Sequence, residues 1–214
     1  MKKLFIEARK KFDNIDFSKL DSLPGNTISL GATIQYLDLI PKLNQYLESK
    51  GKKAIIKQGA YYESHIIGCN PLAFDKKADT ILLLADGKFH ALNNAVNLDK
   101  EIYVFNTQKL ETITNQDIQN YKQHIQAKIN RFLHEERIGV IISTKPGQNY
   151  KQPDQLSKKI ENLKKKPFIF EADSINIGEL ENFPDIKIWI NTACYGLGLD
   201  DKRILNLKDV LEFL

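Results

Sequence analysis

Cysteine is scarce in this chain: only two of its 214 residues are cysteines, beside one tryptophan and one methionine. Two cysteines do not make the disulfide framework of a small secreted protein, and they suit a reducing, cytoplasmic compartment. No CxxC pair is present, which disfavours a closed structural zinc site. The apolar runs are too short to cross a membrane, and charged residues at Glu7, Arg9 and Lys10 interrupt the first of them, so we expect neither a membrane partner nor a signal peptide.

Strong charge of one sign is also lacking. The formal net charge is +4, and the lysines are scattered apart from the run at 164–166, which we interpret as a solvated helix end. We therefore expect no direct nucleic-acid binding. With 42% hydrophobic and 27% charged residues, the chain is long and apolar enough to bury the core of one large or two small domains.

Two successive runs of alternating strands and helices fill most of the sequence. Apolar patterns predict strands over 4–8, 27–33, 53–57, 79–85, 101–106, 137–143, 167–172 and 186–190. Helical spacing predicts a short helix before residue 23 and further helices over 34–50, 92–98, 115–137, 152–166 and 178–183. The tail 204–214 offers one more strand and a short helix. The sequence thus predicts an α/β fold of two similar small three-layer domains with mostly parallel sheets.

The two cysteines both follow short apolar runs. Cys194 comes after the strand predicted over 186–190, and Cys69 lies where a second run breaks at Gly68 and Asn70. Ligands of open α/β sheets bind beyond the carboxyl ends of the strands. Each cysteine taken alone fits a small buried core residue. The alternative is a pair of thiolates that holds a soft metal or an iron–sulfur cluster.

Three further motifs follow predicted strands and could bind a ligand. The loop 143–148 (STKPGQ) offers backbone N–H groups, a hydroxyl and an ammonium to an anion, or it is an ordinary helix entry. In 85–90 (ADGKFH) a turn leads to His90, which could orient a ligand. The small residues of 31–35 (GATIQ) allow close approach of a ligand or close packing of a helix. We interpret the other histidines as surface residues: His65, His124 and His134.

In this order, four of these motifs resemble the diphthamide synthase family: GCN at 68–70, ADGKFH at 85–90, STKPGQ at 143–148 and NTAC at 191–194. LFIEAR at 4–9 is similar to the last strand of the family's first domain. The resemblance implies three α/β domains that each give one cysteine to a [4Fe–4S] cluster. It also implies a radical reaction that transfers the 3-amino-3-carboxypropyl group of S-adenosyl-L-methionine to a histidine of translation elongation factor 2.

Carried onto this chain, the resemblance makes Cys69 and Cys194 cluster ligands. It assigns no catalytic residue beyond them, and His90 is the one further candidate. The candidate residues for binding S-adenosylmethionine come from three motifs. The motif at 31–35, which is not one of the four that carry the resemblance, gives Thr33 and Gln35; the motifs at 85–90 and 143–148 give Asp86, Gly87, Ser143, Thr144, Lys145, Gly147 and Gln148.

The sequence departs from the family in two ways. It has no third cysteine, and Tyr195-Gly196 follows NTAC where the family commonly has Pro-Arg; Lys145 or Arg203 could replace that arginine. We expect 1–25 to be a strand–helix remnant of the first domain, 26–136 a second-type domain and 137–214 a third-type domain. A separately encoded first domain would supply the third cysteine, and a homodimer or heterodimer is compatible with this. The alternative is a non-catalytic accessory or degenerate subunit that binds elongation factor 2 or a cluster without cleaving S-adenosylmethionine.

Overall fold

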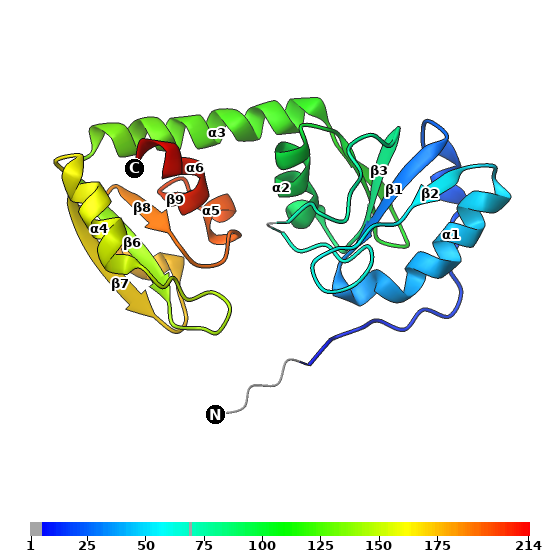
Figure 1. Ribbon diagram of the computed structural model, residues 1–214, viewed down its shortest axis with the longest axis horizontal. Coiled ribbons are helices and arrows are strands. Elements are labelled where there is room, and N and C mark those ends of the chain that lie inside the picture. Colours follow the sequence, from blue (N-terminus) through cyan, green and yellow to red (C-terminus); the bar gives the residue numbers. More distant parts are fainter. Residues whose placement is uncertain (1–5, 69) are drawn as a thin grey trace. The chain divides into compact units, whose positions relative to one another are not determined.

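The computed structural model describes residues 6–68 and 70–214, and for Asp200 it describes the backbone alone. The chain divides into two compact units, an N-terminal unit that reaches to Asn120 and a C-terminal unit that covers Tyr121–Leu214. This division falls within the long helix α3 (Asn115–His134), which is drawn in green in Figure 1. Each unit has a sheet and helices of its own.

The sheet of the N-terminal unit has five strands in the order β2-β1-β3-β4-β5. They are β1 (Thr27–Ala32), β2 (Lys53–Ile55), β3 (Thr80–Leu84), β4 (Ile102–Phe105) and β5 (Leu110–Ile113). β1 is parallel to β2 and β3, and β3 is parallel to β4. β5 pairs with β4 in the antiparallel sense, which a short turn allows.

Helices cover both faces of this sheet (Figure 1). Because side chains alternate along a strand, Leu82 and Leu84 of β3 point to one face and Ile81 and Leu83 to the other. The first face packs against α1 and the turns of 3-10 helix around it, and the second against α2. These elements are η1 (Ser18–Ser22), η2 (Ile34–Leu39), α1 (Ile40–Ser49) and α2 (Lys88–Leu98).

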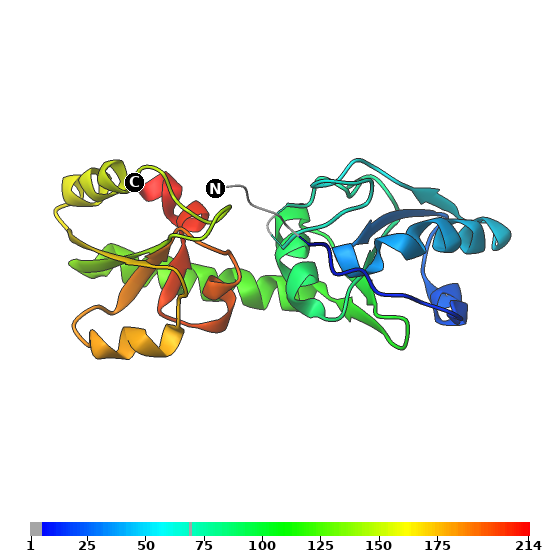
Figure 2. The same ribbon diagram turned by 90° about the horizontal axis from the view of Figure 1, so that it is seen from below.

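The C-terminal unit has a four-stranded sheet in the order β7-β6-β8-β9, and all its pairs are parallel. The strands are β6 (Arg137–Ser143), β7 (Lys166–Ala172), β8 (Ile188–Asn191) and β9 (Ile204–Asn206). In Figure 2, α4 in yellow and the 3-10 helix η3 in orange lie on opposite faces of this sheet. The remaining elements are α4 (Pro153–Asn162), η3 (Ile177–Asn182), α5 (Leu197–Asp200), α6 (Leu207–Val210) and η4 (Leu211–Phe213).

A glycine makes room for the single tryptophan between β6 and β8. Gly139 is paired in register with Trp189, whose side chain is fully buried against Phe170. A Cβ atom on Gly139 would lie 2.2 Å from Cε3 of the indole, far inside van der Waals contact. Only glycine therefore fits at this position without movement of the tryptophan.

The predicted α/β class with parallel sheets is confirmed, and the structure corrects several details. No strand forms over 6–8, the described part of the strand predicted at 4–8; there the carboxylate of Glu7 accepts a hydrogen bond from the hydroxyl of Tyr62. The antiparallel β5 was not predicted, and the helix predicted over 34–50 begins as 3-10 helix. The assignment of the two units to second-type and third-type domains stays a prediction. Among the described residues, no helix has the length and apolar character needed to cross a membrane.

Candidate functional site

The strand order places two potential ligand sites, one in each unit. In the N-terminal sheet, β1 lies between β2 and β3, so the chain leaves β1 toward one side and β3 lies on the other. In the C-terminal sheet, β6 lies in the same way between β7 and β8. At such topological switch points the loops after the two central strands diverge and leave a crevice at the carboxyl ends of the strands. Three of the four predicted motifs follow β3, β6 and β8 directly. The fourth, at 68–70, contains Cys69, which lies outside the described residues.

The loop after β6 is fixed by its own hydrogen bonds. Ser143 is buried, and its Oγ accepts a hydrogen bond from the backbone N–H of Lys145 at 3.1 Å. The backbone N–H of Gln148 donates to the carbonyl of Lys145, and Gly147 has a φ of +82°, which favours glycine. The side chains of Lys145 and Gln148 are exposed. The loop thus exposes the ammonium of Lys145 and the amide of Gln148 on a turn closed by hydrogen bonds. These groups can bind an anion or the carboxylate of an amino acid.

Cys194 lies in the loop after β8, at the same switch point. Its side chain is exposed and the thiol is free. The interpretation of this cysteine as a small core residue is therefore wrong. The loop is joined to the end of β6, since both the backbone N–H and the hydroxyl of Thr192 donate to the carbonyl of Ile141. A thiol with this exposure is accessible to a metal or cluster, which cysteine binds as the thiolate.

Two buried asparagine side chains hold the backbone of the Cys194 loop in place. Asn191 and Asn206 are the last residues of β8 and β9, are paired in register, and are 2% and 4% exposed. The Asn191 amide donates to the carbonyl of Cys194 at 2.8 Å and to Oδ1 of Asn206 at 2.7 Å. Its own Oδ1 accepts from the backbone N–H of Ala193 at 3.0 Å. From the sequence, Asn191 was identified only as the first residue of the NTAC motif, with no role of its own.

The residue after Cys194 is anchored to α6. The hydroxyl of Tyr195 donates to the carboxylate of Asp209, and the ammonium of Lys208 lies 4.0 Å from the centre of the tyrosine ring. Burial raises the pKa of both Tyr195 and Asp209, and it raises the pKa of the nearby Tyr121 to about 12. Tyr195 is therefore a neutral hydrogen-bond donor at physiological pH.

In the N-terminal unit, Asp86 after β3 is the centre of a hydrogen-bonded group. It accepts from the Lys10 ammonium at 2.6 and 2.7 Å and from the hydroxyl of Tyr36. These two donors hold the pKa of Asp86 below its ordinary value, so the carboxylate is ionised. Gly87 beside it is exposed, extended and the N-cap of α2. The sequence did not predict that Lys10 and Tyr36 contact Asp86, because Lys10, for example, lies 76 positions before it.

The motif at 31–35 is explained mainly by packing. A Cβ atom on Gly31 would lie 2.5 Å from the ring of Phe74, so the glycine is needed for contact within the core. Thr33 is buried, and its N–H donates to the carbonyl of Leu84 at the end of β3. Gln35 is half-buried and its carbonyl accepts from the N–H of Lys10. The structure thus places Thr33 and Gln35 near the switch point, but their backbones serve the fold.

His90 and the segment before Cys69 meet at α2. His90 is half-buried, and burial lowers its pKa, so its imidazole is neutral. Two buried asparagines of α2 hold this segment: the Asn93 amide donates to the carbonyl of Gly68, and the Asn94 amide donates to that of Ile67 at 3.4 Å. Cys69 itself lies outside the described residues.

Three other interpretations are changed by the structure. His65 is buried and not a surface residue, and burial lowers its pKa, whereas His124 and His134 are exposed as predicted. Lys165 donates to two backbone carbonyls and is half-buried, so the lysine run is not wholly solvated. Arg203 is bound by Asp201 through its Nε and Nη2 atoms, and so it does not offer a free cation in place of the family's arginine.

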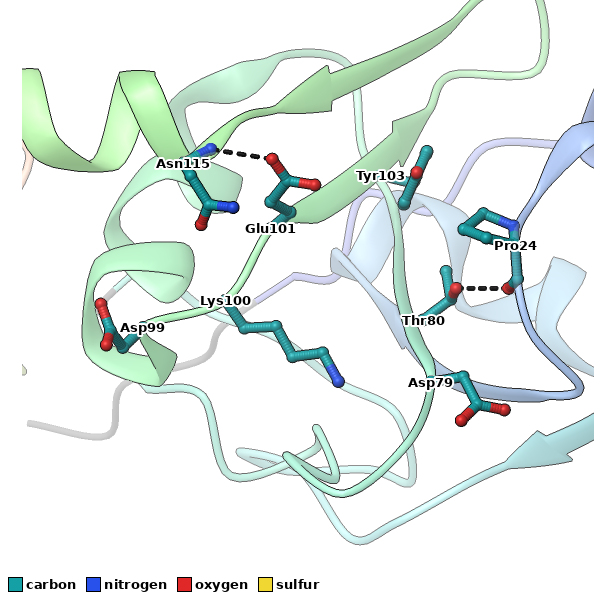
Figure 3. A pocket seen from close by; sticks show the side chains of 8 residues that line it. All are labelled: Pro24, Asp79, Thr80, Asp99, Lys100, Glu101, Tyr103 and Asn115. Atoms are coloured by element: carbon teal, nitrogen blue, oxygen red, sulfur yellow. Dashed lines mark hydrogen bonds between the residues drawn. The ribbon is translucent and has the colours of Figure 1, made fainter.

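A cavity of about 320 Å³ lies at the opposite edge of the N-terminal sheet, at the amino ends of β3 and β4 (Figure 3). Its polar groups are used by the fold. The carboxylate of Asp79 accepts from two backbone N–H groups, Thr80 donates to the carbonyl of Pro24, and Glu101 accepts from the N–H of Asn115. The cavity is therefore part of the scaffold and not a candidate ligand site.

The described geometry defines an α/β protein with two switch-point loops per unit and an exposed thiol at one of them. The family model described as "Putative diphthamide synthesis protein" matches residues 1–205, so the chain belongs to this family. The relatives include proteins named 2-(3-amino-3-carboxypropyl)histidine synthase from Pyrococcus horikoshii, 25% identical over 87% of this chain, and from Methanocaldococcus jannaschii, 28% identical over 83%.

Solved structures agree with this membership. A crystal structure of Dph2 from Pyrococcus horikoshii with a 4Fe-4S cluster matches 87% of this chain with a TM-score of 0.76 and 25% identity. The chain spans about half the length of these relatives, namely 56% of the Pyrococcus protein and 47% of the Methanocaldococcus protein.

Proposed function

We propose that this chain is part of a radical S-adenosylmethionine enzyme that transfers the 3-amino-3-carboxypropyl group to a histidine of translation elongation factor 2. The observation that carries the proposal is the exposed Cys194 thiol at a switch point whose other loop presents Lys145 and Gln148. Its relatives are named for this reaction, and one of them holds a 4Fe-4S cluster.

In this proposal Cys194 and Cys69 would hold the [4Fe–4S] cluster as thiolates. When bound, the cluster supplies the electron that opens a carbon–sulfur bond of S-adenosylmethionine. Lys145 and Gln148 would bind the amino-acid part of S-adenosylmethionine by charge and hydrogen bonding, and Asp86 would accept from its ammonium or ribose. His90, neutral and half-buried, could accept a proton near the Cys69 segment. Iron ligation by exposed thiols requires a reducing compartment, so we propose a cytoplasmic location.

A cluster with one iron open to substrate needs a third protein thiolate, and these 214 residues contain only two cysteines. We propose that a separate polypeptide, equivalent to the family's first domain, supplies it and forms a heterodimer with this chain. The second candidate is an accessory subunit that binds elongation factor 2 or a cluster without cleaving S-adenosylmethionine. Gly196 at the position of the family's arginine, together with the pairing of Arg203 with Asp201, favours this candidate.

The test is anaerobic reconstitution with iron and sulfide, followed by metal analysis and the electronic spectrum, for the chain alone and with a candidate first-domain protein. Cys69→Ala and Cys194→Ala should each reduce the iron content. His124→Ala is the matched control, since it removes an exposed nitrogen ligand outside both switch points. Equal iron content in all variants would refute the ligand assignment.

The two candidate functions differ in the next step. A cluster that forms well only with the partner, followed by S-adenosylmethionine-dependent modification of elongation factor 2, supports the split enzyme. A cluster without cleavage of S-adenosylmethionine supports the accessory subunit.

A further inference from the structure

The two cysteine segments of this chain share a feature that neither the family match nor the motif spacing assigns. In each unit, a buried asparagine side chain donates to a backbone carbonyl at or directly before a cysteine. Asn191 donates to the carbonyl of Cys194, and Asn93 donates to that of Gly68, which precedes Cys69. Both asparagines are at most 2% exposed.

We propose that Asn191, supported by Asn206, is a positioning residue that fixes the Cys194 thiol in the orientation needed for cluster ligation. This inference rests on the proposed function and concerns the same site. Asn191 does not touch the thiol in the described contacts; it acts through the backbone on either side of it.

The carbonyl of Cys194 is held by two donors. It accepts from the Asn191 amide at 2.8 Å and from the backbone N–H of Leu197 at 3.1 Å. The Thr192–Ala193 peptide is held as well, because the N–H of Ala193 donates to Oδ1 of Asn191. Main-chain rotation at Cys194 would therefore break at least one hydrogen bond of a buried amide, which is costly in a low-dielectric interior.

Asn206 keeps the Asn191 side chain in this orientation. Its Oδ1 accepts from the Asn191 amide, and its register partner on β8 is Asn191 itself. A Cβ atom on Gly198 of α5 would lie 2.3 Å from Nδ2 of Asn206, so the space beside the Asn206 amide is closed. The Asn191–Asn206 pair therefore has little freedom to rearrange, as expected for a group that supports a metal ligand.

The test uses Asn191→Asp and Asn191→Ala in the full chain, with Ile160→Val as the matched control. Asn191→Asp keeps the shape and the acceptor for Ala193 but removes both donated bonds. Ile160 is fully buried on α4 and packs in the same unit away from the Cys194 loop. Each protein is reconstituted together with the first-domain partner, and the rate of cluster loss to a chelator is measured, with thermal melting to compare stability.

We expect both Asn191 variants to lose the cluster at least about tenfold faster than wild type, because loss of a group that orients a metal ligand commonly weakens metal binding by about 10–100-fold. Ile160→Val should change only the melting temperature. The amide protons of Ala193 and Leu197 should exchange faster in Asn191→Ala. Cluster loss no faster than in Ile160→Val would overturn the positioning role even where wild type binds the cluster. If wild type binds no cluster, the proposed function is refuted, and with it the role of Asn191 in cluster ligation. Unchanged amide exchange at Ala193 and Leu197 in Asn191→Ala would separately refute the inference that Asn191 orders the Cys194 loop.

Discussion

Replacement of Gly139 by alanine tests how tightly the sheet of the C-terminal unit is built. The new Cβ atom would lie 2.2 Å from Cε3 and 2.6 Å from Cδ2 of Trp189. Carbon atoms in contact are about 3.5 Å apart or more, so the indole or the strand must move by about 1 Å. The indole has little room to move, since its ring packs edge-on against the ring of Phe170, with 4.6 Å between the ring centres, and lies 6.0 Å from the ring centre of Phe183.

Overpacking of this kind costs about 1–3 kcal/mol. The loss of glycine's freedom in the unfolded chain returns about 0.4–1 kcal/mol, so the net loss of unfolding free energy should lie between about 0 and 2.6 kcal/mol, with a central value of about 1.3 kcal/mol. For a unit of this size the central value corresponds to a fall in melting temperature of about 5–10 °C.

The assay is thermal unfolding followed by circular dichroism and by tryptophan fluorescence, because Trp189 is the only tryptophan in the chain. Gly178→Ala is the control, since the nearest atom to its Cβ would be Asn176 Oδ1 at an ordinary 3.4 Å. In circular dichroism, which does not depend on the tryptophan, Gly139→Ala should cost less in a Trp189→Phe protein than in wild type, since the smaller ring leaves space for the methyl group. A Gly139→Ala protein as stable as Gly178→Ala would refute the packing argument.

Three further outcomes are expected. Because burial raises the pKa of Asp209 in the folded chain, ionisation of this carboxyl group destabilises the fold as the pH rises above the ordinary carboxyl value. Asp209→Asn should therefore raise the melting temperature at pH 7 and leave it unchanged at a pH low enough to protonate Asp209 in wild type. A lower melting temperature at pH 7 would show that the hydrogen bond from Tyr195 to the ionised carboxylate matters more. Lys10→Ala removes a largely exposed partner of Asp86, so denaturant unfolding should show a loss below about 1 kcal/mol that shrinks with added salt; a larger, salt-independent loss would contradict this. Lys145→Ala should weaken S-adenosylmethionine binding in calorimetry with the cluster spectrum intact, and unchanged affinity would remove this loop from the site.

The sequence predicts the parts of this fold that depend on hydrophobic pattern. The buried strands β3, β6 and β8 are continuous apolar runs, and motifs placed directly after them lie at the carboxyl edges where the structure has them. No strand forms in the described part of the segment 4–8, where Glu7 accepts a hydrogen bond from Tyr62, a residue 55 positions later. β5 was missed because its four residues, Leu-Glu-Thr-Ile, contain only two apolar side chains, and these lie three positions apart.

The site shows a second limit of pattern reasoning. A polar residue at the end of a strand, such as Asn191, has the same local signature whether it forms an ordinary turn or holds a distant side chain. Its role depends on Asn206, which lies 15 positions later and reaches it only through the parallel pairing of β8 with β9. The ion pair of Lys10 with Asp86 likewise joins residues that are far apart in the sequence and meet only in the folded chain.

In the C-terminal unit, exposure separates the candidate ligand groups from three groups that the fold uses. Ser143 closes its own loop, Asn191 holds the Cys194 backbone and Arg203 is bound by Asp201, and these three are buried or half-buried. By contrast, Cys194 and Lys145 are exposed on loops that those buried groups hold in place. A degenerate subunit would have no reason to keep an exposed thiol on a backbone fixed by buried amides, because an exposed thiol is prone to oxidation and adds nothing to packing. The arrangement therefore favours the ligand role of Cys194 over simple decay, and the iron content of Cys194→Ala after reconstitution is the most direct comparison between them.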